Sequence, residues 1–170
     1  MKRLIGVLAA LSGVLLASLT MATPANAARP DNGAWNAMTN LNSGRCAAVG
    51  NDSRSPGAGL IHYKCDGKYN KRFKALPAGG NLYFLQIRST GMCVAPQTGA
   101  DHAVLIQNWC DYSGFAKVWA IEYLGNDSYR LRNQSTGLCM GVAWGVTFSG
   151  QPLDQTTCDA FPGQAWRFWS

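Results

Sequence analysis

The stretch Ser135-Thr136-Gly137-Leu138-Cys139 decides the fold, because a similar stretch occurs three times in the chain. It recurs upstream as Ser89-Thr90-Gly91-Met92-Cys93 and, more loosely, as Asn42-Ser43-Gly44-Arg45-Cys46. The cysteines that end these stretches are 47 and then 46 residues apart. A repeat of this period indicates one supersecondary unit that has been copied, and a single copy cannot bury a core of its own.

The second half of each copy repeats as well. A second cysteine follows the first after 19, 17 and 19 residues, and an aromatic residue follows eight or nine residues later. The second cysteines are Cys65, Cys110 and Cys158, and the aromatic residues are Phe73, Trp119 and Trp166. Because these aromatic residues are equivalent in a threefold structure, we expect them to converge near its axis as core anchors.

The three copies span residues 34–76, 82–124 and 129–169, and each contains short strand-like runs separated by turn residues. The clearest runs cover residues 83–87, 103–106, 118–121, 129–131 and 166–169. No stretch of eleven residues has a convincing helical period. The sequence therefore predicts an all-β protein with about four short strands per copy.

The N-terminus has the pattern of a secretory signal peptide. Lys2 and Arg3 precede an apolar run over residues 4–19, and Ala25-Asn26-Ala27 provides a cleavage site. We expect a signal peptide at residues 1–27, a short leader at 28–33, one domain at 34–170, and a secreted (extracellular) protein. The alternative is an uncleaved anchor, although the run is short for a membrane span. No later stretch is long and apolar enough for one.

All six cysteines lie in the exported part, where disulfides are stable. Six cysteines allow fifteen pairings. If each copy has one structure, its two cysteines have one geometry, which predicts the pairs Cys46–Cys65, Cys93–Cys110 and Cys139–Cys158. A metal site is not expected, because no Cys-x-x-Cys occurs and only two histidines are present. We expect no cofactor.

Basic residues cluster between positions 64 and 74, at Lys64, Lys68, Lys71, Arg72 and Lys74. Without Lys2 and Arg3 the formal charge of the chain falls only from +6 to +4. The cluster is interpreted as a solvated loop, with attraction to phosphates or an anionic cell surface as the alternative. Aromatic residues do not interleave with it as a single-strand nucleic-acid groove would require, so we expect no nucleic-acid partner.

The triplicated small-Gly-x-Cys turn, second cysteine and Gln-x-Trp resemble the ricin-type β-trefoil lectin domain. The resemblance covers nearly all of the chain after residue 33. Gln164-Ala165-Trp166 matches the signature in full, whereas Lys117-Val118-Trp119 and Lys71-Arg72-Phe73 match it in part. The resemblance implies a pseudo-threefold β-trefoil of about twelve strands with the three disulfides above. It also implies weak, non-covalent carbohydrate binding in shallow pockets.

Carried over by position, the family's pocket residues survive best in the first copy. The family aspartate, two residues after the first cysteine, is replaced by Ala48, Ala95 and Gly141. The stacking aromatic is kept only as Tyr63, and the amide before the signature only as Asn70. Asp52 supplies the missing carboxylate if its loop folds back. His62 replaces a strand glutamine that is present as Gln107 and Gln155. The candidate carbohydrate-binding residues are Tyr63, Asn70, Asp52 and His62.

Two tryptophans, Trp109 and Trp144, have no place in the family pattern. Trp144 lies with Phe148 in a loop between glycines, and we expect it to cover the end of the barrel, with presentation to a ligand as the alternative.

The first functional hypothesis is a lectin-like module that binds a cell-surface or cell-wall glycan. The alternative is a trefoil scaffold that has lost sugar binding and acts on a protein partner, as an inhibitor or toxin accessory subunit. No catalytic residue and no enzyme are expected, because Glu122 is the single glutamate and no paired-carboxylate or nucleophile motif is present.

Overall fold

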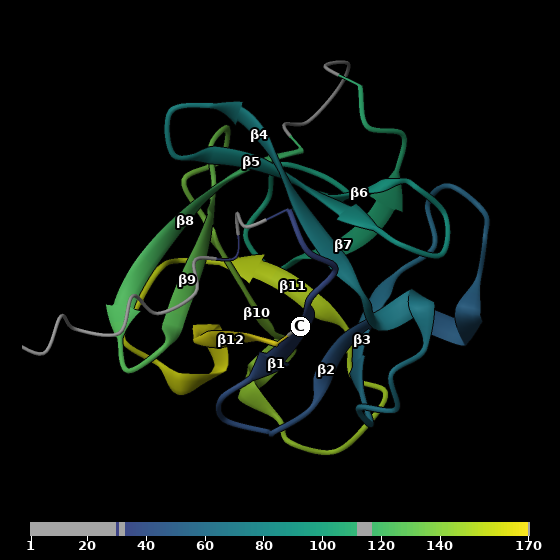
Figure 1. Ribbon diagram of the computed structural model, residues 1–170. Helices are drawn as coiled ribbons and strands as arrows, with labels where there is room; N and C mark the ends of the chain where they lie inside the picture. The colour runs from purple at the N-terminus through teal and green to yellow at the C-terminus, as the bar shows by residue number, and fades with distance from the viewer. Residues whose placement is uncertain (1–29, 31–32, 112–116, 170) are drawn as a thin grey trace, which may run out of the picture.

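The computed structural model describes residue 30 and residues 33–111 and 117–169. The predicted signal peptide and most of the leader lie outside these residues. The described part is all-β, as predicted, with twelve short strands (Figure 1). The strands are β1 (Ala37–Asn40), β2 (Cys46–Val49), β3 (Leu60–Tyr63), β4 (Phe73–Gly79), β5 (Leu82–Ile87), β6 (Cys93–Pro96), β7 (Ala103–Asn108), β8 (Val118–Gly125), β9 (Ser128–Asn133), β10 (Cys139–Val142), β11 (Leu153–Thr156) and β12 (Trp166–Trp169).

Four single turns of 3-10 helix interrupt the loops. They are η1 (Gly50–Asp52), η2 (Tyr69–Lys71), η3 (Ala143–Gly145) and η4 (Pro162–Gln164). Turns η1 and η3 follow β2 and β10, at equivalent places in the first and third repeats. Turns η2 and η4 precede β4 and β12 in the same way. The regular elements therefore reproduce the sequence repeat.

The strands pair as a barrel that is covered at one end by hairpins. Antiparallel pairs join β1 to β12, β12 to β9, β9 to β8, β8 to β5, and β5 to β4. A bridge between Asn36 and Phe73 closes the ring from β4 back to the start of β1. The hairpins β2–β3, β6–β7 and β10–β11 complete the three repeats. This is the β-trefoil arrangement that the sequence predicts.

The predicted aromatic anchors lie in the core. Phe73, Trp119 and Trp166 are at most 1% exposed, and all three belong to one cluster of buried residues. The two indoles also donate hydrogen bonds to backbone carbonyls one residue after a first cysteine, from Trp119 Nε1 to Val94 O and from Trp166 Nε1 to Met140 O, each at 3.0 Å. Phe73 has no N–H to donate, so the first repeat has the buried ring without the hydrogen bond to the strand carbonyl.

The repeated turn needs its glycine. Gly44, Gly91 and Gly137 have φ values of 66°, 72° and 70°, in the left-handed region that side chains disfavour. Each glycine N–H donates to the carbonyl four residues earlier, on Asn40, Ile87 or Asn133, at 2.8–2.9 Å. The turn therefore brings the first cysteine back onto the preceding strand in the same geometry each time.

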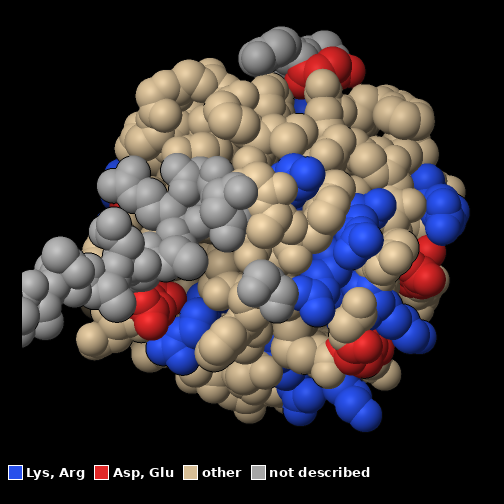
Figure 2. All heavy atoms as spheres, in the orientation of Figure 1, with Lys and Arg blue, Asp and Glu red and all other residues tan. Residues whose placement is uncertain are grey.

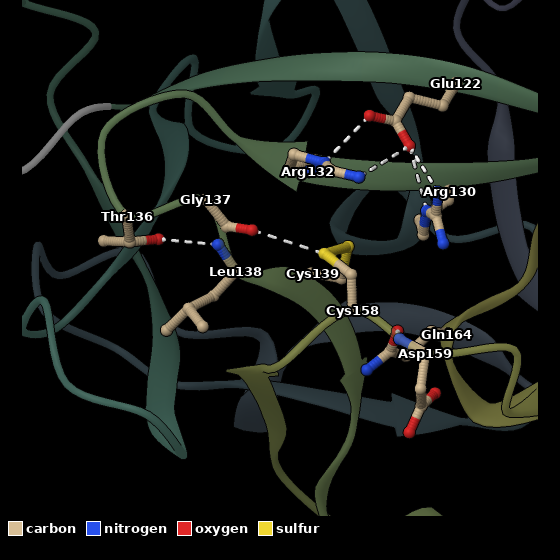
Figure 3. A network of polar contacts seen from close by, with 10 residues as sticks. All are labelled: Glu122, Arg130, Arg132, Thr136, Gly137, Leu138, Cys139, Cys158, Asp159 and Gln164. Carbon is tan, nitrogen blue, oxygen red and sulfur yellow. Dashed lines mark hydrogen bonds and ion pairs between the residues drawn. A yellow bond between two sulfur atoms is a disulfide. The ribbon is translucent and has the colours of Figure 1, made fainter.

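The three disulfides join Cys46 to Cys65, Cys93 to Cys110 and Cys139 to Cys158, as the repeat predicts. Figure 3 shows the third of these beside its turn, where Cys158 Sγ lies 3.3 Å from Gly137 O. Each disulfide therefore joins the glycine turn of its repeat to the chain just after the outer hairpin.

Candidate functional site

The first repeat holds a cavity of about 370 Å³ on its outer hairpin. Turn η1 and β2 form one side of it, the end of β3 another, and the loop leading into η2 a third. The lining residues are Ala48, Val49, Asn51, Asp52, Ile61, Tyr63, Asp66, Lys68, Asn70 and Lys71. Three of the four residues predicted from the sequence, Asp52, Tyr63 and Asn70, are thus brought together in one cavity.

Tyr63 supplies an aromatic surface at the end of β3, where it is 45% exposed. The ammonium of Lys71 lies 5.6 Å from the centroid of its ring. Lys71 itself is only 4% exposed, and its Nζ lies 2.8 Å from Asp66 Oδ1. This hydrogen bond lowers the pKa of Asp66. An ion pair therefore fixes the cation that borders the Tyr63 ring.

Asn70 presents an amide that the protein satisfies only in part. Its Nδ2 donates to Val49 O at 3.0 Å, whereas its Oδ1 is buried and has no hydrogen-bond partner among the described residues. The side chain is 5% exposed and lines the cavity. A buried acceptor without a partner is costly, so the hydrogen bonding of this amide is incomplete at the wall of the cavity.

Asp52 reaches the cavity because the backbone of η1 turns sharply. Asn51 and Asp52 both have φ 52°, in the left-handed region, which asparagine and aspartate tolerate better than most residues. The carboxylate is on an exposed residue, and the cavity is also lined by the strand position of the family aspartate. That position, Ala48, is 1% exposed. The loop thus places a carboxylate at the cavity, as the sequence hypothesis requires.

His62 does not line the cavity, contrary to the prediction that it is a pocket residue. Its side chain is fully buried, with Nε2 2.6 Å from Phe148 O and Nδ1 3.1 Å from Ser43 Oγ. A carbonyl can only accept, so Nε2 carries the proton and Nδ1 accepts from the hydroxyl. Burial lowers the pKa of His62, which favours this neutral form.

His62 instead takes the place of a glutamine that ties the repeats together. Gln107 Oε1 accepts from the Thr90 hydroxyl, and its Nε2 donates to Ser53 O and Ser55 O in the first repeat. Gln155 makes the same bonds: its Oε1 accepts from the Thr136 hydroxyl, and its Nε2 donates to Thr98 O and Ala100 O in the second repeat. His62 Nε2 makes the equivalent contact to Phe148 O in the third repeat. These bonds link each hairpin to the loop of the preceding repeat in a closed cycle.

The equivalent place in the third repeat is occupied by the protein itself. Gly145 and Gly163 stand where the first repeat has Asp52 and Asn70. A Cβ at Gly145 would lie 2.6 Å from Phe161 Cζ, and one at Gly163 would lie 2.9 Å from Phe161 Cδ1. The Phe161 ring therefore packs against both glycines, in the space that the two polar side chains occupy in the first repeat.

A carboxylate is nevertheless buried beside this place. Asp154, across β10–β11 from Gly141, is 2% exposed, and its Oδ2 lies 2.9 Å from His102 Nδ1. Burial raises the pKa of Asp154, and the hydrogen bond to Asp154 raises the pKa of His102. The His102 ring stacks on Trp144 with centroids 4.6 Å apart. Trp144 is 79% exposed, so the expectation that it is buried over the barrel end is wrong.

The lone glutamate is held by two arginines. Glu122 on β8 lies 2.8 Å from Arg130 Nη2 and 2.8 Å from Arg132 Nε on β9 (Figure 3). Its carboxylate is therefore neutralised within one hairpin. Among the described residues there is also no group of three or more His, Cys, Asp or Glu side chains arranged to hold a metal ion.

The strands form a β-trefoil, and its first repeat carries a cavity on the outer hairpin. The family comparison agrees, because the model of the ricin-type beta-trefoil lectin domain-like family matches residues 27–109 and 77–156. The chain belongs to this family. No curated protein sequence matches it.

Solved structures show the same fold. The chain is 25% identical to the designed threefold-symmetric protein ThreeFoil, with a TM-score of 0.76, covering 80% of this chain and 98% of that one. The chain is 18% identical to a Macrolepiota procera ricin B-like lectin in complex with lactose, with a TM-score of 0.69, covering 80% of this chain and 94% of that one. It is also 18% identical to the Haemophilus ducreyi cytolethal distending toxin, with a TM-score of 0.64, covering 82% of this chain and 84% of that one.

No helix in the described part of the chain is long and apolar enough to cross a membrane. Three disulfides are compatible with an extracellular protein.

Proposed function

We propose that the protein is a secreted lectin-like module that binds carbohydrate non-covalently through the cavity of the first repeat. The observation that carries this proposal is the meeting of Asp52, Tyr63 and Asn70 around one cavity, where Asn70 Oδ1 has no hydrogen-bond partner among the described residues. An exposed aromatic ring covers the apolar face of a sugar, while a carboxylate and an amide orient its hydroxyls.

A glycan array probed with the oxidised protein tests the proposal and identifies the sugar. On the sugar with the strongest signal, Tyr63→Ala should weaken binding by about tenfold or more, because it removes the central aromatic contact. Asp52→Asn, which keeps the shape and removes the charge, should also weaken it. The matched control is Thr156→Ala, at the position of Tyr63 in the third repeat, which should leave binding unchanged. Unchanged binding in Tyr63→Ala would refute the assignment.

A second candidate is a scaffold that acts through protein contacts. It is favoured by the third repeat, where Trp144 and Phe148 are 79% and 60% exposed and Phe161 fills the equivalent of the cavity. The fold is also shared with a cytolethal distending toxin. Retention on polysaccharide columns that is lost in Tyr63→Ala supports the lectin. Absence of glycan binding, together with a partner captured by wild type and lost in Trp144→Ala, supports the scaffold.

A further inference from the structure

A basic surface adjoins the cavity where β4 begins and β5 ends. We call it the basic face and define it by Trp35, Tyr69, Arg72, Lys74 and Arg88. Because Phe73 pairs with Ile87, Arg72 and Arg88 stand opposite each other, and Arg88 N donates to Arg72 O at 2.9 Å. Lys74 lies two residues along β4 and so points to the same side. Figure 2 shows basic side chains as a diagonal stripe on the side of the molecule that carries the C-terminal end.

Aromatic rings hold these cations at the surface. The Arg88 guanidinium carbon lies 4.0 Å from the centroid of the Tyr69 ring and 5.9 Å from that of Trp35. Lys74 Nζ lies 4.7 Å from the same Trp35 centroid. Such contacts orient a cation but leave its net charge in place. The tertiary structure therefore brings Trp35 and Arg88, which lie far from residues 64–74 in the sequence, together with Tyr69 and Lys74.

The charge of the basic face is not balanced by carboxylates in the part of the chain that the structure describes. Among the described residues, no ion pair is formed by Arg72, Lys74 or Arg88, and Arg72 Nη1 has the Trp169 carbonyl at 3.4 Å. The β8–β9 hairpin differs, because there a glutamate neutralises the arginines. Like charges directly opposite each other on paired strands are destabilising, so an anion bound across Arg72 and Arg88 would relieve their repulsion.

The basic face begins one residue from the cavity. Lys68 and Asn70 line the cavity, whereas Tyr69 between them contacts Arg88. Turn η2 therefore has one side on the cavity and the other on the basic face. A chain of sugars that leaves the cavity over η2 meets the cations directly.

We propose that the basic face binds an anionic polysaccharide, one that carries carboxylate or phosphate groups along its chain. This inference deepens the proposed function, since it takes the ligand to be a glycan. The alternative polyanion, single-stranded nucleic acid, fits less well, because it needs open aromatic faces for stacked bases. Here Trp35 and Tyr69 already carry cations on their rings.

The test compares polygalacturonate with its fully methyl-esterified form, which has the same backbone without the charges. Wild type should bind polygalacturonate more tightly, with an affinity that falls as salt is raised. Arg88→Gln and Lys74→Gln should each weaken binding to polygalacturonate by roughly fivefold and leave the ester unaffected. Arg54→Gln, which removes one charge from an exposed loop residue, is the matched control and should have little effect.

Each outcome decides the inference. Equal losses in Arg54→Gln and Arg88→Gln would mean that only the net charge matters and would overturn it, as would tighter binding of an oligothymidylate than of polygalacturonate. Inorganic polyphosphate in place of polygalacturonate tells whether phosphate or carboxylate is preferred. Tyr63→Ala separates the two proposals: binding that is lost in Arg88→Gln but kept in Tyr63→Ala supports the basic face and refutes the cavity.

Discussion

The first and third repeats follow the same backbone path and differ in what fills the outer hairpin. Asn51 and Trp144, each five residues past the first cysteine, have φ 52° and φ 59° and start the same sharp turn. In the first repeat Asp52 and Asn70 then line an open cavity. In the third, glycines replace both and the Phe161 ring packs against them. The first and third repeats thus share the scaffold and differ in the pocket, because the pocket side chains contribute little to the core.

The largest expected effect tests whether the repeats are alike in their cores. Phe73→Ala, Trp119→Ala and Trp166→Ala should each lower the free energy of unfolding by about 3–5 kcal/mol, because each removes a fully buried ring and leaves a cavity. Urea unfolding of the oxidised proteins measures this cost. A cost below about 1 kcal/mol for any one of them would show that its ring is not part of the shared core.

A smaller effect is expected where the repeats differ. Phe161→Ala should lower the free energy of unfolding by about 1–2 kcal/mol, because the ring is 48% exposed and only part of its apolar area is buried. Glycan binding at the first repeat should be unchanged, as measured by calorimetry. Phe148→Ala, which removes a 60% exposed ring from the same repeat, is the control and should cost less. Loss of glycan binding in Phe161→Ala would place the working site in the third repeat.

The smallest effect concerns two histidines that respond to pH in opposite directions. Burial holds the pKa of His62 below its ordinary value of 6.5, so its stabilising effect is present above pH 6.5 and is lost as the pH falls through its folded pKa. Asp154 raises the pKa of His102 above 6.5, so its stabilising effect is present below pH 6.5 and is lost as the pH rises through its folded pKa.

Thermal unfolding from pH 4.5 to 9 separates the two histidines by substitution. His62→Gln, which restores the residue found in the other repeats, should reduce the loss of stability on the acid side. His102→Gln should reduce the loss on the alkaline side, by less, because the His102 side chain is 42% exposed. If the loss of stability at acid pH is the same in His62→Gln as in wild type, His62 is not its cause.

Much of the architecture follows from the periodic sequence alone. Cysteines, glycine turns and aromatic anchors recur in phase, and a repeated local pattern has one geometry, so the disulfides and the all-β class were predictable. The strand-like runs at residues 83–87, 103–106, 118–121, 129–131 and 166–169 all lie within observed strands. The partial signatures also have a reason: Lys71 and Lys117, where the family has glutamine, are buried and form ion pairs with Asp66 and Asp111.

The candidate site was predictable only in part. Tyr63 and Asn70 have fixed offsets from the cysteines, and Asp52 was placed by hypothesis, since its reach depends on the φ values of η1. His62 was misplaced because a residue at a family strand position can face either the pocket or the interior. Nothing in the local sequence marked Phe161 as the residue that fills the third pocket, since its contacts are to glycines 16 residues before it and two residues after it.

By itself the sequence determined the threefold unit, its disulfides and its core anchors, because these depend on spacing within one repeat. Only the tertiary structure decided which pocket is open, which histidine is buried and which cations gather with Trp35 and Tyr69. Those features depend on contacts between segments far apart in the chain, where a side chain's surroundings come from other strands and loops and not from its own neighbours in sequence.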